Sequence, residues 1–163
     1  MIELIHGDLT ECKTDFICHQ ANYHGVMGAG VALAIKDKLL SPEAYAAYQN
    51  LCARKGAALL GTVQYLPCGR SSDGYLGILF NLFCQDEVPT RSGCFTRYDC
   101  MRKCLAKVDF LARKNGNRSV AIPENMGCGI AGGNWATVRQ IVEDVFTRSP
   151  VKLSIVRWDR DEK

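Results

Sequence analysis

Polar side chains that could bind or activate a ligand end an apolar segment early in the chain. Residues 16–21 (FICHQA) form a short, mostly apolar run that contains His19, and Asn22 follows it. The next residues include three glycines, Gly25, Gly28 and Gly30. An imidazole can deprotonate water or protonate a leaving oxygen near physiological pH, and glycines let backbone N–H groups surround an anion.

A second glycine-rich segment lies much later in the chain. Residues 124–133 (ENMGCGIAGG) run from an expected strand into an expected helix, as residues 22–30 do. Two such loops in one small domain favour a diphosphate ligand, because helix N-termini add a favourable partial charge. Neither loop has the Gly-Lys-Ser/Thr ending of a phosphate-binding loop or a Rossmann G-x-G-x-x-G after the first strand, which argues against a kinase and a dehydrogenase.

The elements that must position these loops alternate between strands and helices. Hydrophobic periodicity and turn signals predict strands over 1–5, 16–21, 61–67, 75–83, 119–123 and 151–158. They predict helices over 29–39, from Ser41 to near Gly56, and over about 97–114 and 134–146. This alternation predicts an α/β fold with a mostly parallel sheet covered on both faces. Ligands in such sheets bind beyond the carboxyl ends of the strands.

Composition limits the remaining possibilities. The chain has 163 residues, which predicts a single domain over 1–163, and its formal charge of +3 is too small to argue for a nucleic-acid partner. Its nine cysteines lack any Cys-x-x-Cys spacing, so we expect reduced thiols rather than structural zinc or disulfides. The absence of a long apolar run and of a signal-peptide pattern predicts a cytoplasmic protein with no membrane partner.

Four motifs together resemble the macrodomain family, the ADP-ribose-binding fold. They are GDLT at 7–10, ICHQAN at 17–22, NLFCQ at 81–85 and IPENMGCGIAGGNW at 122–135. The resemblance implies a three-layer α/β/α macrodomain with a mostly parallel mixed sheet. It is similar to the small stand-alone branch related to ADP-ribose 1″-phosphate phosphatases and terminal ADP-ribose protein glycohydrolases.

The resemblance also implies site residues. Asp8 would accept a hydrogen bond from the adenine amino group, the backbone of Leu9 would contact the ring, and Asn22 would bind the distal ribose. Two sets of loop residues would line the diphosphate: Gly28, Ala29, Gly30 and Val31, and Gly127, Cys128, Gly129, Ile130 and Ala131. The structural alternatives are that Asp8 caps a turn, that Asn22 occupies a left-handed turn, and that the glycines serve helix-entry packing.

His19 is the candidate catalytic residue. In a strand it would share a face with Ile17 and Ala21, while Cys18 and Gln20 point the other way. The alternative is a hydrogen-bonded structural histidine. Cys128 has no evident base near it in sequence, so we interpret it as a small loop residue.

The sequence departs from the better-known mechanisms of the family. Ala32 stands where the protein-deacylating branch has an acid after the first glycine loop. Ala131 stands where the terminal glycohydrolase branch has an aspartate, and no lysine lies between Lys55 and Lys103 to match that branch's lysine. Asp86 and Asp99 remain as acids whose position the sequence does not give.

These observations predict a protein that binds ADP-ribose or a derivative and hydrolyses its distal end. The favoured reaction is removal of the 1″-phosphate from ADP-ribose 1″-phosphate, with His19 transferring a proton. The alternatives are an ADP-ribosyl hydrolase acting on modified protein or nucleic acid, and a reader module without turnover. We expect no cofactor and no metal, ADP-ribosylated macromolecules as further partners, and a monomer rather than an oligomer.

Overall fold

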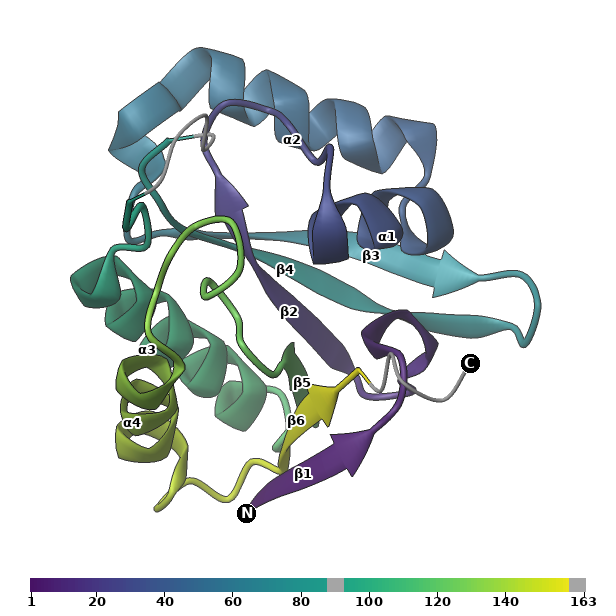
Figure 1. Ribbon diagram of the computed structural model, residues 1–163. Helices are drawn as coiled ribbons and strands as arrows, with labels where there is room; N and C mark the ends of the chain where they lie inside the picture. The colour runs from purple at the N-terminus through teal and green to yellow at the C-terminus, as the bar shows by residue number, and fades with distance from the viewer. Residues whose placement is uncertain (88–92, 159–163) are drawn as a thin grey trace.

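Six strands form one sheet in the computed structural model, which describes residues 1–87 and 93–158 (Figure 1). The strands are β1 (Ile2–His6), β2 (Phe16–Asn22), β3 (Val63–Arg70), β4 (Tyr75–Gln85), β5 (Val120–Pro123) and β6 (Leu153–Arg157). Their order is β1-β6-β5-β2-β4-β3, and only the β3–β4 pair is antiparallel. The predicted mostly parallel mixed sheet is confirmed. Of the predicted 1–163 domain, residues 88–92 and 159–163 lie outside the described part.

Two helices cover each face of this sheet (Figure 1). The helices are α1 (Gly30–Leu39), α2 (Pro42–Lys55), α3 (Tyr98–Lys114) and α4 (Trp135–Phe146). Helices α1 and α2 lie on one face, and α3 and α4 lie on the other. The predicted three-layer arrangement is confirmed. Two 3-10 helices, Leu9–Glu11 and Gly56–Leu59, were not predicted, because a single turn is too short to show a periodic pattern.

Strand β2 is apolar on both sides because it lies inside this sandwich. Ile17 packs in a cluster with residues of α1, and Cys18 packs in the larger cluster of α3 and α4. The predicted alternation of side chains along β2 is therefore confirmed. A strand with two buried faces needs a nearly continuous apolar run, which residues 16–21 provide.

Local signals set the ends of α2. The Ser41 hydroxyl accepts a hydrogen bond from the Ala44 N–H at 3.1 Å, and Pro42 occupies the first helical position. Gly56 ends the helix with a φ of +49°, a conformation that favours glycine. The helix therefore begins and ends where the sequence predicts.

The nine cysteines all carry free thiols. Six of them are buried, as expected for cysteines that behave as small apolar residues: Cys18, Cys52, Cys68, Cys84, Cys100 and Cys104. In the described residues, no helix has the length and apolar character needed to cross a bilayer.

Candidate functional site

The predicted site residues follow parallel strands and therefore gather at one end of the sheet. Because β1, β6, β5 and β2 are mutually parallel, their last residues define a common carboxyl end. Asp8 follows β1 there, the loop 22–30 follows β2, and the loop 124–133 follows β5. The two loops therefore follow the carboxyl ends of strands, as the sequence predicts, and Asp8 lies at the same end of the sheet.

Asp8 caps the short helix that follows β1. Its Oδ1 accepts hydrogen bonds from the Thr10 N–H at 2.8 Å and the Thr10 hydroxyl at 2.7 Å, and its Oδ2 faces the Lys38 ammonium at 3.3 Å. Burial raises the pKa of Asp8, but the bonds from Thr10 and Lys38 outweigh burial and leave the pKa below its usual value. The turn-capping alternative is thus observed, and 15% of the Asp8 side chain remains exposed.

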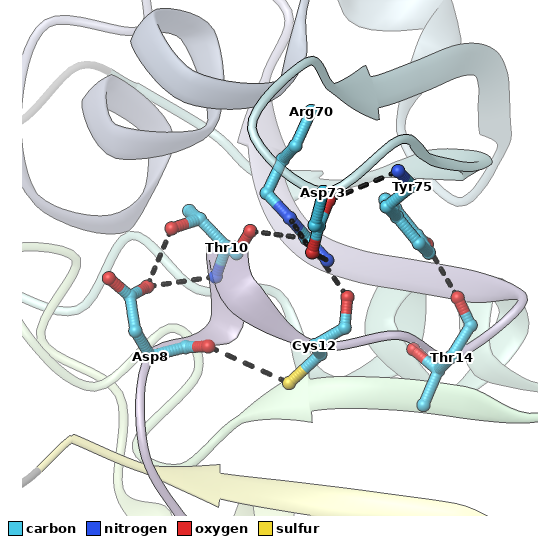
Figure 2. Close-up of polar contacts among 7 residues, drawn as sticks. All are labelled: Asp8, Thr10, Cys12, Thr14, Arg70, Asp73 and Tyr75. Atoms are coloured by element: carbon cyan, nitrogen blue, oxygen red, sulfur yellow. Dashed lines mark hydrogen bonds and ion pairs between the residues drawn. The ribbon is translucent and has the colours of Figure 1, made fainter.

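The segment that carries Asp8 is held against the β3–β4 hairpin (Figure 2). Arg70 donates hydrogen bonds to the carbonyl oxygens of Thr10 at 2.5 Å and Cys12 at 3.0 Å, and Asp73 pairs with the same guanidinium at 3.1 Å. Tyr75 donates its hydroxyl to the Thr14 carbonyl. These bonds fix the backbone that positions Asp8.

Asn22 organises the first glycine loop. Its Nδ2 donates to the Val26 carbonyl at 2.8 Å, and its Oδ1 accepts from the His24 N–H at 2.9 Å and the Tyr48 hydroxyl at 3.1 Å. Asn22 does not have a positive φ, so the left-handed-turn alternative is wrong for this residue. One amide hydrogen remains for a ligand, and the ribose contact stays a prediction.

The four predicted residues before and at the start of α1 are exposed. Ala29 is the N-cap of α1 and makes no side-chain capping bond, and the first turn holds no acidic residue. A Cβ at Gly28 would meet only Val26 Cγ1 at 3.5 Å, and one at Gly30 would meet nothing within 4 Å. Val31 is also exposed. Helix-start N–H groups without a side-chain cap, next to glycines with open space around their Cα atoms, suit an anion.

The second glycine loop is packed more tightly. A Cβ on Gly127 would lie 2.7 Å from Gln20 Oε1 and 2.9 Å from Thr96 Oγ1, and one on Gly133 would lie 2.5 Å from the Gly127 carbonyl oxygen. Thr96 also donates its hydroxyl to the Gly127 carbonyl at 2.6 Å. The packing alternative is therefore correct for Gly127 and Gly133.

The middle of the second loop is open. A Cβ on Gly129 would meet nothing within 4 Å, and Ile130 is 65% exposed. Ala131 is instead buried, and its carbonyl accepts a hydrogen bond from the Phe95 N–H at 2.7 Å. Within the predicted set, Gly129 and Ile130 are the loop residues best placed to meet a ligand.

Cys128 does not have the properties of a nucleophile. Its thiol donates to the Met126 carbonyl at 3.3 Å, and burial, with a smaller contribution from Cys94, raises its pKa to about 11. The interpretation of Cys128 as a small loop residue agrees with this environment.

His19 lies inside the protein, beneath α1 and α2. Its side chain is 2% exposed, and Nε2 lies 2.6 Å from Asn81 Oδ1, while Asn81 donates to Gln64 at 3.1 Å. Burial lowers the pKa of His19 to about 4, although the bond with Asn81 partly opposes this shift. The imidazole is therefore neutral near pH 7. These contacts favour a structural role, and its catalytic role stays a prediction.

The two acids whose position the sequence did not give lie around Arg97. Asp86 pairs with the Arg97 guanidinium at 3.2 Å, and Asp99 lies 3.5 Å from it. The ring of His24, from the first loop, contacts the Asp86 carbonyl oxygen at 3.2 Å. Asp86 thus lies beside the first loop, whereas Asp99 is 64% exposed at the start of α3.

Sequence reasoning missed the residues that hold the loops. Lys38 neutralises Asp8, Tyr48 binds Asn22, and Gln20 and Thr96 support Gly127. Glu124, directly after β5, forms a two-point ion pair with Arg157 at 2.6 and 2.7 Å. Only Gln20 had a local signal, as a polar residue in an apolar strand. The others approach through tertiary contacts. In the described ranges, no three His, Cys, Asp or Glu side chains are grouped to hold a metal ion.

Comparisons with known proteins agree with this arrangement. The model of the family described as "Macro domain" matches residues 18–142. Human ADP-ribose glycohydrolase OARD1 is 28% identical over 156 residues, which cover 94% of this chain and 90% of that protein. The DNA ADP-ribosyl glycohydrolase of Mycobacterium tuberculosis is 28% identical over 152 residues, which cover 92% of this chain and 40% of that protein.

Solved structures show the same fold. The macrodomain of Mycobacterium tuberculosis DarG superposes with a TM-score of 0.78 at 26% identity, covering 96% of this chain and 97% of that one. The macrodomain of Thermus aquaticus DarG gives a TM-score of 0.75 at 25% identity, and the superposition covers 96% of this chain and 97% of that one.

Proposed function

Because this chain belongs to the Macro domain family, we propose that it binds ADP-ribose or an ADP-ribose derivative and hydrolyses a bond at the distal ribose. Two relatives support a hydrolase, since one is named an ADP-ribose glycohydrolase and the other a DNA ADP-ribosyl glycohydrolase. The proposed reaction releases the group attached to the distal ribose. That group is either a macromolecule or, as the sequence favours, a 1″-phosphate.

The observation that carries this proposal is the exposed, uncapped start of α1 after the first glycine loop. Its backbone N–H groups would bind one side of the diphosphate, and the open backbone around Gly129 would bind the other. A diphosphate held there would leave the adenosine free to extend across the ends of β5 and β6 toward Asp8, which follows the edge strand β1 at the same end of the sheet.

Asp8 would then bind the adenine. Among the residues that the structure describes, the one polar contact of its Oδ2 is with the ammonium of Lys38, whose side chain is 51% exposed. The adenine amino group would donate to this oxygen, because the carboxylate is ionised at neutral pH.

Replacing Asp8 tests the adenine contact. We expect Asp8→Ala to weaken ADP-ribose binding by about 1 to 3 kcal/mol, measured by calorimetry, because the adenine loses a charged acceptor. Lys38→Gln is the matched control, since it removes the ion pair and keeps the carboxylate. Equal affinities in wild type and Asp8→Ala would remove Asp8 from the site.

The chemical step distinguishes two enzyme classes. In a glycohydrolase, water attacks the anomeric carbon, the bond from that carbon to the macromolecule breaks, and the macromolecule leaves with a proton. In the phosphatase reaction, water attacks phosphorus, the bond from phosphorus to the 1″-oxygen breaks, and ADP-ribose leaves with a proton on that oxygen while inorganic phosphate forms. The relatives' names support the first class. Ala131, in the position where that branch carries an aspartate, supports the second, and its side chain is buried here.

Three assays on the full chain separate these functions. Calorimetry with ADP-ribose measures binding, phosphate release from ADP-ribose 1″-phosphate measures the phosphatase, and ADP-ribose release from modified DNA or protein measures the hydrolase. Binding with no release in either assay would identify a reader module. Absence of binding in the first assay would refute the proposed site.

A further inference from the structure

The segment that contains helix α3, residues 97–118, concentrates the positive charge of the chain. Residues 97–118 contain seven arginines and lysines and two aspartates, a formal charge of +5, whereas the whole chain carries +3. The rest of the chain is therefore net negative, by two charges. This distribution gives α3 a local field that the overall charge hides.

Three of these basic residues form a stripe on the outer side of α3. The inner side packs on the sheet through fully buried residues such as Met101, Leu105 and Val108. On the outer side, spacings of four, three and four residues bring four exposed side chains into one row, the α3 stripe: Lys103, Lys107, Phe110 and Lys114. Such spacings place side chains above one another on a helix.

Among the described residues, the stripe lysines form no direct ion pair, unlike the arginines beside them, and Lys103 has a longer-range attraction to Asp99. Arg102 pairs with Asp144 at 3.0 Å, and Arg113 pairs with Asp109 at 2.9 Å. Across residues 1–87 and 93–158, no carboxylate lies within ion-pair distance of the three stripe lysines. Their charges are therefore available to an external anion.

Phe110 adds an aromatic surface in the middle of the stripe. Its side chain is 48% exposed, and the ammonium groups of Lys107 and Lys114 lie 5.3 and 6.0 Å from its ring centroid. Both ammonium groups lie over the ring, so a base that stacks on it would displace an ammonium from the ring face, and the displaced cation would remain nearby to contact a phosphate.

We propose that the α3 stripe binds single-stranded nucleic acid, with the lysines contacting phosphates and Phe110 stacking on a base. Lys103 and Lys114 are eleven positions apart, which is about 16 Å of helix and corresponds to about five nucleotides at roughly 3.4 Å each. This length lies within the site sizes of about 4 to 16 nucleotides found for modules that bind single strands.

The same features argue against a membrane surface as the partner. An interfacial helix needs a broad apolar face to insert into lipid, and the apolar face of α3 is buried on the sheet. Phe110 is the single apolar side chain of the stripe. The inference does not depend on the proposed function, because the stripe shares no residue with the predicted ADP-ribose site.

The test measures fluorescence anisotropy of a labelled oligothymidylate of about twelve nucleotides with the full chain, from about 50 to about 200 mM salt. The stripe variant is Lys103→Gln/Lys107→Gln/Lys114→Gln. The control variant, Lys13→Gln/Arg148→Gln/Lys152→Gln, has the same net charge but changes exposed residues elsewhere.

We expect the stripe variant to bind roughly tenfold or more weakly and its salt slope to fall by about 2, since each phosphate contact contributes about 0.7. Phe110→Ala should weaken binding several-fold without changing the slope. The control variant should bind within about twofold of wild type, and all variants should keep the melting temperature of the wild type, which shows that they are folded.

Two results would overturn the inference. One is equal loss in the stripe and control variants, which would show a general charge effect. The other is absence of oligonucleotide binding by the wild type. Binding of the wild type to vesicles that contain phosphatidylserine, measured in parallel, would not rescue the inference. Failure of ADP-ribose binding alone would refute the proposed function and leave this inference intact.

Discussion

The two glycine-rich loops have similar compositions, yet their glycines differ in how closely neighbouring atoms approach them. In the first loop, Gly28 is exposed with little around it, and α1 begins without a side-chain cap. In the second loop, Gly127 and Gly133 are pressed against neighbouring atoms, and the Asn134 side chain caps α4 by accepting from the Thr137 N–H. The first loop leaves the start of its helix without a side-chain cap, whereas most glycines of the second loop allow close packing.

The largest effect should come from a side chain in the packed part of the second loop. Gly127→Val places a branched side chain against Gln20 and Thr96 at a residue with a φ of +74°. We expect the free energy of unfolding in urea to fall by roughly 3 kcal/mol or more, from strain and overpacking together. Gly129→Val is the control, and its free energy of unfolding should fall by less than about 1 kcal/mol. Equal losses would remove the distinction within the loop.

His19 and Gln20 lie on opposite faces of β2, and Gln20 contacts the second loop. Substitution of His19 therefore tests the packing on the other face, which α1 covers. Its pKa is lowered to about 4, against about 6.5 in an unfolded chain, so protonation favours unfolding. The contribution of neutral His19 to stability should be fully present above pH 6.5. The free energy of unfolding should then fall by as much as roughly 3 kcal/mol as the pH drops to 4. Urea titrations of His19→Asn should show much less of this dependence, while the exposed His24→Asn should keep it.

The same variant separates structure from catalysis. A catalytic His19 would lower turnover by roughly 10²- to 10⁴-fold in His19→Asn with little change in melting temperature. Its 2% exposure instead leads us to expect a lower melting temperature and turnover within a few-fold of wild type. A large loss of turnover in a protein of wild-type stability would reverse this assignment.

The open positions should affect binding rather than folding. Gly129→Val and Gly28→Val each place a side chain where the diphosphate would lie, and neither glycine has a positive φ. We expect ADP-ribose affinity to fall by about 100-fold or more, close to 3 kcal/mol, with an unchanged melting temperature. Calorimetry and thermal melts on the same preparations check both parts. Loss of the cooperative melt would show that these glycines are structural.

The smallest effects should come from exchanging the helix caps. Ala29→Asp would give α1 a capping carboxylate, raising stability by about 0.5 to 1 kcal/mol while repelling a bound diphosphate. Asn134→Ala would remove the cap of α4 and lower stability by about 1 kcal/mol, with ADP-ribose affinity nearly unchanged. If Ala29→Asp binds ADP-ribose as tightly as wild type, the start of α1 is not the diphosphate site.

Elements with strong periodic or capping signals were predictable from the sequence. Ser41 and Pro42 marked the start of α2, and the alternation along β2 assigned Ile17 and Cys18 to opposite faces. Strand β3 begins at Val63 rather than at residue 61, because Gly61 and Thr62 belong to the turn after the 3-10 helix, where Thr62 bonds to Leu59.

The site was less predictable, because its geometry depends on contacts between distant residues. Gly127 and Gly129 look alike in the sequence, and only Thr96 and Gln20 distinguish them. His19 was predicted to lie at the mouth of the site, whereas pairing with β4 places it beside Asn81 in the interior. Periodicity gives the face of a strand on which a residue lies, but not how far the covering helices extend over it.

The pairing of β1 with β6 has a consequence for how the protein is made. Ile2 lies beside Leu153, a separation of 151 residues, so β1 can join the sheet only after almost the whole described chain has left the ribosome. Closing so long a loop costs entropy that is recovered late, which slows folding. The end of the site that carries Asp8 should therefore form last, after the two glycine loops are in place.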